Sequence, residues 1–412
     1  MSDFSTNLIL PYLQPAQAQK HVTVNESLLR LDALVQGAVE SRVAAVQPSS
    51  PADGARYILP PGKTGAAWGA MADHAVAYWR DGVWEQITPR SGFRFHVRDE
   101  NRLVVFDGAH WAAPASPGAS LLINGGFPVW QRGASFTSVA SGTYTADRWR
   151  TAAAGMTVSR NADAPAGALE SLQAVAGTSA WSIAQRIERR ACASLVGSRI
   201  CAAFWAKSVD GTGALSVAIA SANAADDFSA VAAVQSIALT GLDTTWKRFF
   251  VVFDSLPASC ANGVELTITR ATPGGTARIA LVQLHAGADA PPFVHRAPAE
   301  ELAACQRYFE KSHNLAVAPG GAPGAGNCTA SVGAPGSAAY ATLAFKVSKR
   351  VAPTFAVFDG AGGAGKLSYY DTAWRNAGTP TVASAGESGF FVQANIAGSL
   401  IVNYDWTASA EL

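Results

Sequence analysis

The stretch "CAAFWAKS", residues 201–208, is a short apolar run with strand-like alternation, and further runs of the same kind follow it. They are "ALSVAIAS" (214–221), "RFFVVFDSL" (248–256), "VELTITRA" (264–271) and "ARIALVQLHAG" (277–287). Gly, Asp, Asn or Pro separates them, and no helical pattern lies between them. Many short strands spaced in this way are typical of a β-sandwich or jelly roll. We therefore expect one such domain over residues 121–297.

Changes of composition divide the rest of the chain into further segments. In chain order, we expect an N-terminal helix and attachment segment (1–48), a small β-hairpin domain (49–112), a linker (113–120), then after the sandwich a connector helix (298–312), a Gly/Pro/Ala-rich loop (313–336) and a C-terminal β tip domain (337–412). The predicted fold class is mainly β. It combines a small N-terminal α+β domain, a central β-sandwich or jelly roll, a short helix and a C-terminal β-sandwich.

The clearest helix signal covers residues 22–46. Thr23 and Glu26 have the spacing of a capping box, in which each side chain satisfies a backbone N–H of the first turn. Apolar residues then recur at spacings of four and three, as in a heptad, until Arg42; they are Val24, Leu28, Leu31, Val35 and Ala38. Two heptads are too few for a free coiled coil. The stripe fits either a seam where three chains meet or a face packed on its own chain.

Two Asp-Gly pairs predict β-hairpins in the segment that follows. Asp81-Gly82 precedes Trp84, and Asp107-Gly108 precedes Trp111, each pair lying between apolar and aromatic residues. Such a pair is the strongest short-range hairpin signal, because both of its residues accept the positive φ of a tight turn.

Composition limits the classes of function. Only 15% of the residues are charged against 49% that are hydrophobic, which favours large contacts between subunits. The net charge of +1 favours neither nucleic acid nor an anionic membrane as a partner. No apolar stretch is long enough for membrane insertion, and the start lacks the features of a signal peptide, so we expect assembly in a cytoplasm.

The five cysteines are scattered without the spacing of a zinc site. They are Cys192, Cys201, Cys260, Cys305 and Cys328. We expect reduced, buried thiols, and neither a metal nor another cofactor.

Glycines in "TFAVFDGAGGAGKLSYY" (354–370) imitate a nucleotide-binding loop. Gly360, Gly362 and Gly365 satisfy G-x-G-x-x-G after a strand. Phosphate binding there requires a helix next, whose first amides hold the phosphates. The following residues are strand-like, so we predict an ordinary loop between strands.

The chain offers no catalytic constellation. It contains neither G-x-S-x-G nor H-E-x-x-H. Asp226 and Asp227 are adjacent, and adjacent residues on a strand point to opposite faces, so we expect a turn or a solvated edge there. We predict no catalytic residues.

"HRAPAEELAACQRYFEKSH" (295–313) is the segment richest in reactive groups. Leu302, Cys305 and Phe309 share one face of a short amphipathic helix and are expected to form its core contact. Glu300 and Glu301 suit the start of this helix and Lys311 its end. We interpret the segment as a connector whose apolar face lies near a trimer axis.

Aromatic residues provide the candidate ligand site. Trp130, Trp149, Trp205 and Trp246 lie in strand-like patterns and are expected in the core. The cluster "SYYDTAWRNAG" (368–378) combines aromatic side chains with turn residues, which a loop could display. Its candidate carbohydrate-binding residues are Tyr369, Tyr370, Trp374 and Arg375. Packing between subunits is the alternative use of this cluster.

Three stretches resemble proteins of phage particles. "LILPYLQPAQAQKHVTVNESLLRLDALVQ" (8–36), with "PADGARYIL" and the Asp-Gly hairpins, resembles an N-terminal domain of unknown function found in fibre and spike proteins of alphaproteobacterial phages and gene transfer agents. The residues that carry this likeness are Pro11, Gln14, Gln17, Gln19, Lys20, His21, Asn25 and Asp32. "LLINGGFPVWQRG" with "YTADRWR" is similar to a tail-fibre jelly roll, and "FKVSKRVAPTFAVFD" resembles a tip domain. The jelly roll of such fibres, expected here over residues 121–297, resembles carbohydrate-binding modules.

The resemblance implies a homotrimeric head spike or tail fibre of a virion or gene transfer agent particle. The N-terminal domain would bind a particle protein in the capsid, portal, baseplate or spike base, and the distal domains would bind host capsular polysaccharide. The alternatives are a polysaccharide depolymerase and a structural head or baseplate component without a ligand.

Overall fold

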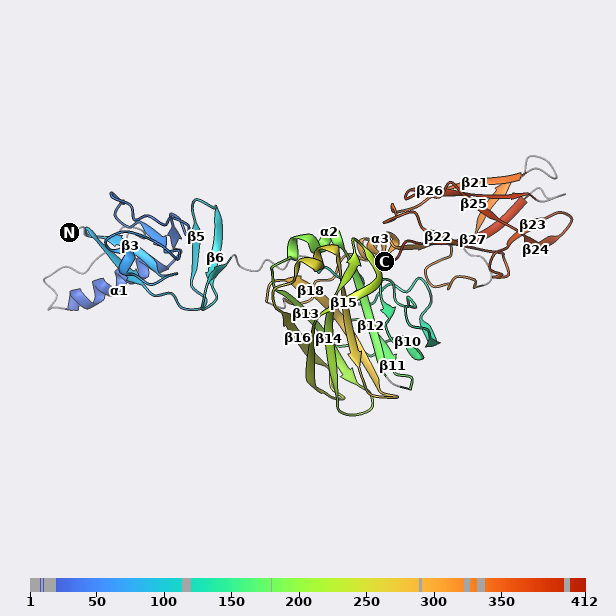
Figure 1. The fold of residues 1–412 in the computed structure, drawn as a ribbon, viewed down its shortest axis with the longest axis horizontal. Helices are drawn as coiled ribbons and strands as arrows, with labels where there is room; N and C mark the ends of the chain where they lie inside the picture. The colour runs from blue at the N-terminus through green and yellow to red at the C-terminus, as the bar shows by residue number, and fades with distance from the viewer. Residues whose placement is uncertain are drawn as a thin grey trace. The chain divides into compact units, whose positions relative to one another are not determined.

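The structure is a computed structural model that describes residues 8, 10, 20–112, 120–178, 180–288, 291–321, 327–331, 338–395 and 401–412. The chain separates into two compact units, residues 1–116 and 117–412 (Figure 1). The fold is mainly β, as predicted, with a jelly-roll sandwich in the second unit. None of the described helices is long and apolar enough to cross a membrane.

The first unit combines one helix with two small sheets. Its elements are α1 (Lys20–Leu34), β1 (Ala38–Val39), β2 (Arg56–Ile58), the 3-10 turn η1 (Trp68–Ala70), β3 (Val76–Arg80), β4 (Val83–Ile87), β5 (Arg94–Val97), β6 (Arg102–Phe106) and β7 (Trp111–Ala112). The sheet orders are β2-β3-β4 and β1-β5-β6-β7. Since β1 pairs with β5, the segment boundary expected at residue 48 falls inside this unit.

The helix α1 ends earlier than the predicted range of residues 22–46. It ends at Leu34 because Gln36 takes a φ of 48° and Gly37 packs directly on Phe95. A Cβ atom on Gly37 would lie 2.3 Å from the Phe95 ring, so only glycine fits. The capping box is also wrong, because α1 already begins at Lys20 and Thr23 lies inside it.

The predicted apolar stripe of α1 is largely exposed. Val24 is 39% exposed, Leu31 50% and Val35 45%, whereas Leu28 is half-buried and Ala38 belongs to β1. The helix packs on its own unit through another face. There Asp32 and Ala33 are buried, and Arg56 donates hydrogen bonds to both of their carbonyl groups.

Both Asp-Gly hairpins are confirmed. Asp81 and Gly82 take positive φ values of 48° and 81° and join β3 to β4. Asp107 joins β6 to β7 by accepting the backbone N–H groups of Ala109 and His110.

The jelly roll consists of two antiparallel sheets around one core. Strand order is β16-β13-β18-β11-β10-β8 in the six-stranded sheet and β15-β14-β17-β12-β9 in the five-stranded sheet. The bounds are β8 (Ser135–Val139), β9 (Arg150–Thr151), β10 (Met156–Asn161), β11 (Ser171–Val175), β12 (Trp181–Glu188), β13 (Ile200–Ser208), β14 (Gly213–Ala224), β15 (Asp227–Leu242), β16 (Lys247–Phe253), β17 (Gly263–Arg270) and β18 (Thr276–Ala286), with short turns α2 (Arg189–Cys192), η2 (Ala193–Leu195) and η3 (Ala258–Asn262). Trp149, Trp181 and Phe204 lie in this core with less than 2% exposure.

The connector helix is shorter than predicted. α3 spans Pro298–Gln306, and the chain then enters β19 (Phe309–Lys311), so Phe309 lies on a strand. Cys305 is fully buried and Leu302 half-buried. Glu301 and Lys311, expected to cover the helix ends, are both buried. The Glu301 carboxylate accepts the backbone N–H of Asn124, which fastens α3 to the jelly roll.

The C-terminal domain is built around its last strand. β27 (Ile401–Ser409) pairs with β19, β20 (Cys328–Ser331), β22 (Thr354–Phe358) and β23 (Leu367–Tyr370), and β23 pairs with β24 (Trp374–Gly378). A second sheet has the order β21-β26-β25, with bounds Ala338–Ala344, Gly389–Asn395 and Thr381–Ala383. The predicted loop 313–336 therefore contains a strand, β20, in its described part. The domain also begins before residue 337, because β19 belongs to it.

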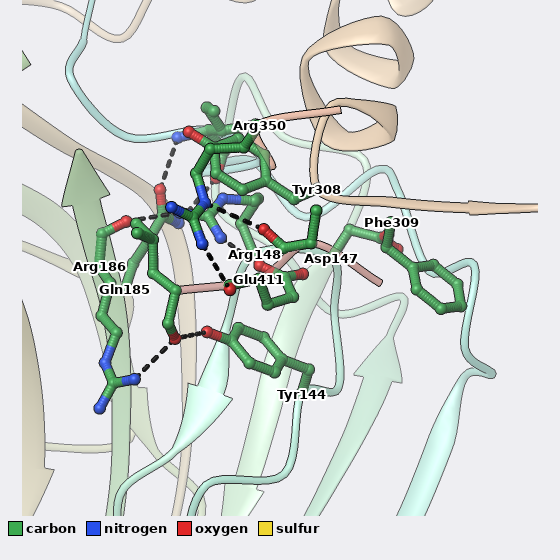
Figure 2. Close-up of polar contacts among 12 residues, drawn as sticks. Tyr144, Asp147, Arg148, Gln185, Arg186, Tyr308, Phe309, Arg350 and Glu411 are labelled. Carbon is green, nitrogen blue, oxygen red and sulfur yellow. Dashed lines mark hydrogen bonds and ion pairs between the residues drawn. The ribbon is translucent and has the colours of Figure 1, made fainter. Parts of the chain in front are cut away.

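Buried charges join this domain to the jelly roll, as Figure 2 shows. The Glu411 carboxylate contacts the guanidinium groups of Arg148 and Arg132. Arg148 is 1% exposed, and its guanidinium stacks on the Tyr308 ring at 3.5 Å. Tyr144 and Arg186 donate hydrogen bonds of 2.8 and 2.6 Å to the Leu412 carbonyl oxygen. The last residues of the chain are thus held on the jelly roll.

We predict that Glu411→Gln destabilises the second unit by about 3 kcal/mol, because it leaves the buried Arg148 without its carboxylate. Chemical unfolding followed by tryptophan fluorescence measures the change. Asp254→Asn, which breaks the exposed ion pair with Arg199, is the matched control and should cost less than about 1 kcal/mol. Equal effects of the two substitutions would contradict the assignment of Glu411 to the junction.

Candidate functional site

The predicted aromatic cluster forms the tip of the β23–β24 hairpin. Tyr370 lies opposite Trp374, with ring centroids 5.6 Å apart, and the two are 40% and 52% exposed. Asp371 shapes the turn by accepting the backbone N–H of Thr372 and the Arg375 guanidinium, and these contacts hold the pKa of its carboxyl well below its usual range.

Three of the four predicted residues therefore lie together at an exposed tip. Tyr369 is the exception, because it is half-buried and packs against the core of the C-terminal domain.

A second aromatic surface lies on the outer face of the six-stranded sheet. Phe204 and Phe249 point into the sandwich core and stack on each other. Their neighbours Trp205 and Phe250 point outward, because successive residues on a strand alternate between faces. Trp205 is half-buried and Phe250 is 55% exposed. The expectation that Trp205 belongs to the core is therefore wrong.

Trp246 lies beside this surface, held by a carboxylate. Its indole N–H donates to Asp163 at 3.0 Å, and the Lys207 ammonium lies 5.7 Å from its ring centroid. Trp246 is half-buried, so the prediction that it lies in the core is also wrong. Trp130 and Trp149 are buried, and for them the predicted core position is confirmed.

Asp163 organises the polar groups around these rings. Its second carboxylate oxygen contacts the Lys207 ammonium at 2.5 Å and the Arg278 guanidinium. Arg278 also donates from Nε to the Gln173 side-chain carbonyl at 3.0 Å, and the Asn161 amide donates to the same oxygen at 3.2 Å. The cluster takes residues from β10, β11, β13 and β18 and from the loop after β10.

The charge state of this cluster follows from these contacts. The hydrogen bond from Lys207 is the main cause that lowers the pKa of the Asp163 carboxyl, and the Trp246 indole adds to it against a partial loss of hydration. Asp163 is therefore an anion at neutral pH, fixed between two cations.

This arrangement has the kinds of group that recognition of a sugar requires. Exposed rings offer flat apolar surface, and fixed amides and charges beside them can pair with hydroxyl or carboxylate groups. Hydrolysis of a glycosidic bond requires two carboxyl groups about 5–9 Å apart. Among the residues just described, this face contributes one carboxylate, that of Asp163.

The other predicted features are structural. Asp226 lies in the turn between β14 and β15, as expected, and accepts the backbone N–H of Arg189, whereas Asp227 is the first residue of β15. The glycine-rich loop after β22 leads into β23 without a helix, which confirms the reading as an ordinary loop. Among the cysteines, all but the half-buried Cys328 are buried. Within the described parts of the chain, no three His, Cys, Asp or Glu side chains could hold a metal ion together.

The outer face of the five-stranded sheet is already occupied near β12. Arg150 and Arg186 both pair with Glu265, and Arg186 also binds the Leu412 carbonyl. On the six-stranded sheet, one end is crossed by the chain at Pro291, whose carbonyl accepts from Arg248 and Gln283. Beside this crossing, Phe250 is 55% exposed, the Asp163 side chain is 35% exposed and Trp205 is half-buried.

Comparisons with known proteins give one family match within the first unit and several solved structures that are similar to part of the chain. Residues 24–112 match a family described as a protein of unknown function, DUF2793. No curated protein matches the chain.

Three solved structures share part of the fold. The CBM22-1 xylan-binding domain of Paenibacillus barcinonensis Xyn10C is 16% identical, with 43% of this chain and 100% of that chain covered and a TM-score of 0.28. A candidate sugar-binding protein from Bacteroides thetaiotaomicron is 15% identical, with 40% and 99% covered and a TM-score of 0.30. Tailspike protein 4 of bacteriophage CBA120, in its enzymatically active domain, is 19% identical, with 43% and 22% covered and a TM-score of 0.29. Because similarities this distant carry no argument about function, the function of this protein has to be inferred from its own side chains.

We predict that Asp163→Asn lowers stability in a pH-dependent way. The folded pKa of Asp163 lies below its unfolded value of about 3.9, so the unfolded state binds the proton first as the pH falls. The stability difference between wild type and variant should be full above about pH 5 and disappear as the pH falls through the lower, folded pKa. Denaturant titrations of both proteins across this range measure it. A difference that grows toward acid pH would contradict the charge assignment.

Proposed function

We propose that this chain is a receptor-binding component of a phage or gene transfer agent particle, and that it binds a host-surface polysaccharide without cleaving it. The observation that carries the binding part is the outward pair Trp205 and Phe250 beside the polar cluster of Asp163. We define the sheet-face site by six residues, which are Asp163, Trp205, Lys207, Trp246, Phe250 and Arg278.

The geometry of the sheet-face site supports a sugar ligand. The rings lie on strands of a sheet, so their positions are fixed before a ligand arrives, and little entropy is lost on binding. The polar groups are likewise held by one another. The outer face of a sheet accommodates a chain of sugar rings more readily than a compact metabolite, which requires an enclosing pocket.

The particle role rests on the N-terminal unit. Its sequence resembles the N-terminal domains of phage and gene transfer agent fibres and spikes, and we propose that it binds a capsid, portal, baseplate or spike-base protein. Head spike and tail fibre are both compatible with this role. Assembly in the bacterial cytoplasm would follow.

A binding experiment with purified bacterial capsular polysaccharides, immobilised as a panel, tests the function and separates the two aromatic surfaces. We expect Phe250→Ala to weaken binding about tenfold, because it removes an exposed aromatic anchor. Val231→Ala, an exposed apolar residue on the other sheet, is the control and should bind like wild type.

The other outcomes of this experiment each contradict part of the proposal. Loss of binding in Trp374→Ala with full binding in Phe250→Ala would move the site to the β23–β24 hairpin. Release of oligosaccharides from a bound capsule would indicate a depolymerase. Absence of binding across the panel would favour a purely structural component.

We also propose that the particle form is a homotrimer joined in part through α1. Its support is the exposure of Val24 and Leu31 on α1 and of Val35 directly after it, which is costly for a single chain in water. Low overall charge is consistent with large contacts between subunits.

Leu31→Lys should shift the solution mass toward that of a single 42.6 kDa chain, because it places a charge in the proposed seam. Light scattering after size-exclusion chromatography measures the mass. Val43→Lys, at an exposed apolar residue of the same unit outside α1, should keep the wild-type mass. A wild-type protein that is monomeric at micromolar concentration would contradict the trimer.

A further inference from the structure

We propose that the polysaccharide bound at the sheet-face site is an extended, ribbon-like polymer, and that about three of its sugar rings lie in a line along β13 and β16, over Phe250, Trp205 and Trp246. This inference rests on the proposed function and names the class of its ligand. Polymers of this class are joined through equatorial bonds at opposite corners of each sugar ring, so successive rings continue in one direction.

The strand register places the three aromatic side chains in one row. Phe250 lies on the outer face of β16, and Trp246 directly precedes this strand, four residues earlier, at about 13 Å along the strand direction. Arg248 lies midway between them, and Trp205 is opposite Arg248 on β13. Trp205 is therefore about 7 Å from each of the other two rings along the strands, and about 5 Å to the side.

Two contacts keep Trp246 in this row although it precedes β16. Lys207 follows Trp205 on the outer face of β13, and its ammonium lies 5.7 Å from the Trp246 ring centroid. The Trp246 indole N–H donates to Asp163, which the same ammonium contacts. The position of this ring is thus set by side chains from β13 and from the loop after β10, and the spacing of the row exists before a ligand binds.

Within the described part of the sheet, the row of rings follows the strands and does not continue across them. β16 is the edge of the sheet, and on the other side β18 presents the fully buried Ala280 opposite Trp205. At the Phe250 end, the opposite residue Ala203 is 1% exposed, and the chain crosses the sheet at Pro291, whose carbonyl accepts hydrogen bonds from side chains of β16 and β18. A ligand that covers all three rings therefore has to run parallel to β13 and β16.

An extended polymer matches this spacing. A sugar ring linked at opposite corners advances its chain by about 5 Å, since the covalent bonds involved are about 1.5 Å long. About three such rings span the distance from Phe250 to Trp246, and each aromatic face can cover the apolar face of a sugar. A polymer joined through axial bonds turns out of line at each bond and soon leaves the sheet face, so it would leave at least one of the aromatic side chains uncovered.

The test uses the full chain with extended polymers (xylan, galactomannan and hydroxyethylcellulose) and with axially linked ones (amylose, pullulan and dextran). Wild type should bind at least one extended polymer about tenfold more tightly than every axially linked one. Among oligosaccharides of that polymer, wild type should bind one of four sugar units about tenfold more tightly than one of two units, because only the longer one reaches all three rings. Phe250→Ala should lose this preference for length, whereas Val231→Ala, on the other sheet, is the control and should keep it.

The outcomes separate this inference from the proposed function. Tightest binding of an axially linked polymer, still weakened by Phe250→Ala, would overturn the extended class and leave polysaccharide binding at the sheet-face site intact. Equal binding of the two-unit and four-unit ligands would also overturn it. Where only a capsular polysaccharide of the earlier panel binds, its linkages and its own oligosaccharides are judged by the same two criteria. Absence of binding to every polymer in both panels would overturn the proposed function and the inference together.

Discussion

The carboxylate of Asp163 is the interaction on which the sheet-face site depends. It lies in the loop after β10, yet it contacts side chains from β13, from β18 and from the turn before β16. Without it, Lys207 and Arg278 would face each other as like charges across two paired strands, which is destabilising. With it, the two cations and the Trp246 ring hold fixed positions beside Trp205. The site is thus ordered before any ligand binds.

The jelly roll uses its two outer faces differently. On the five-stranded sheet, Arg186 and Glu265 are engaged with each other and with the C-terminal residues of the chain, so that face helps to hold the C-terminal domain. On the six-stranded sheet, the cations near Trp205 and Phe250 remain partly accessible.

The fold class could be predicted from the sequence because strand alternation and turn residues are local signals. The Asp-Gly hairpins and the strands of the jelly roll were predicted from such local signals. The ends of helices were less predictable, since α1 stops where Gly37 must pack on Phe95, a residue far away in the chain. In the same way, α3 stops because residues 309–311 pair with β27, almost a hundred residues later.

The hairpin tip was predictable because its aromatic and turn residues are contiguous, whereas the sheet-face site joins residues from 163 to 278. One local signal pointed to it. Phe204 and Trp205, like Phe249 and Phe250, are adjacent in strands, and adjacent side chains cannot both face the core. The register of the sheet decides which member of each pair faces outward. The same register brings Asp163 to these outward rings.

The central claim is that a polysaccharide lies on the outer face of the six-stranded sheet. Hydroxyl-radical footprinting of the full chain, with and without a polysaccharide that it binds, tests this directly, because each aromatic side chain is labelled according to its exposure. The account predicts that the ligand protects Phe250, Trp205 and Trp246 and leaves Tyr370 and Trp374 labelled as before. Protection of Tyr370 and Trp374 alone, with Phe250 unchanged, would contradict it.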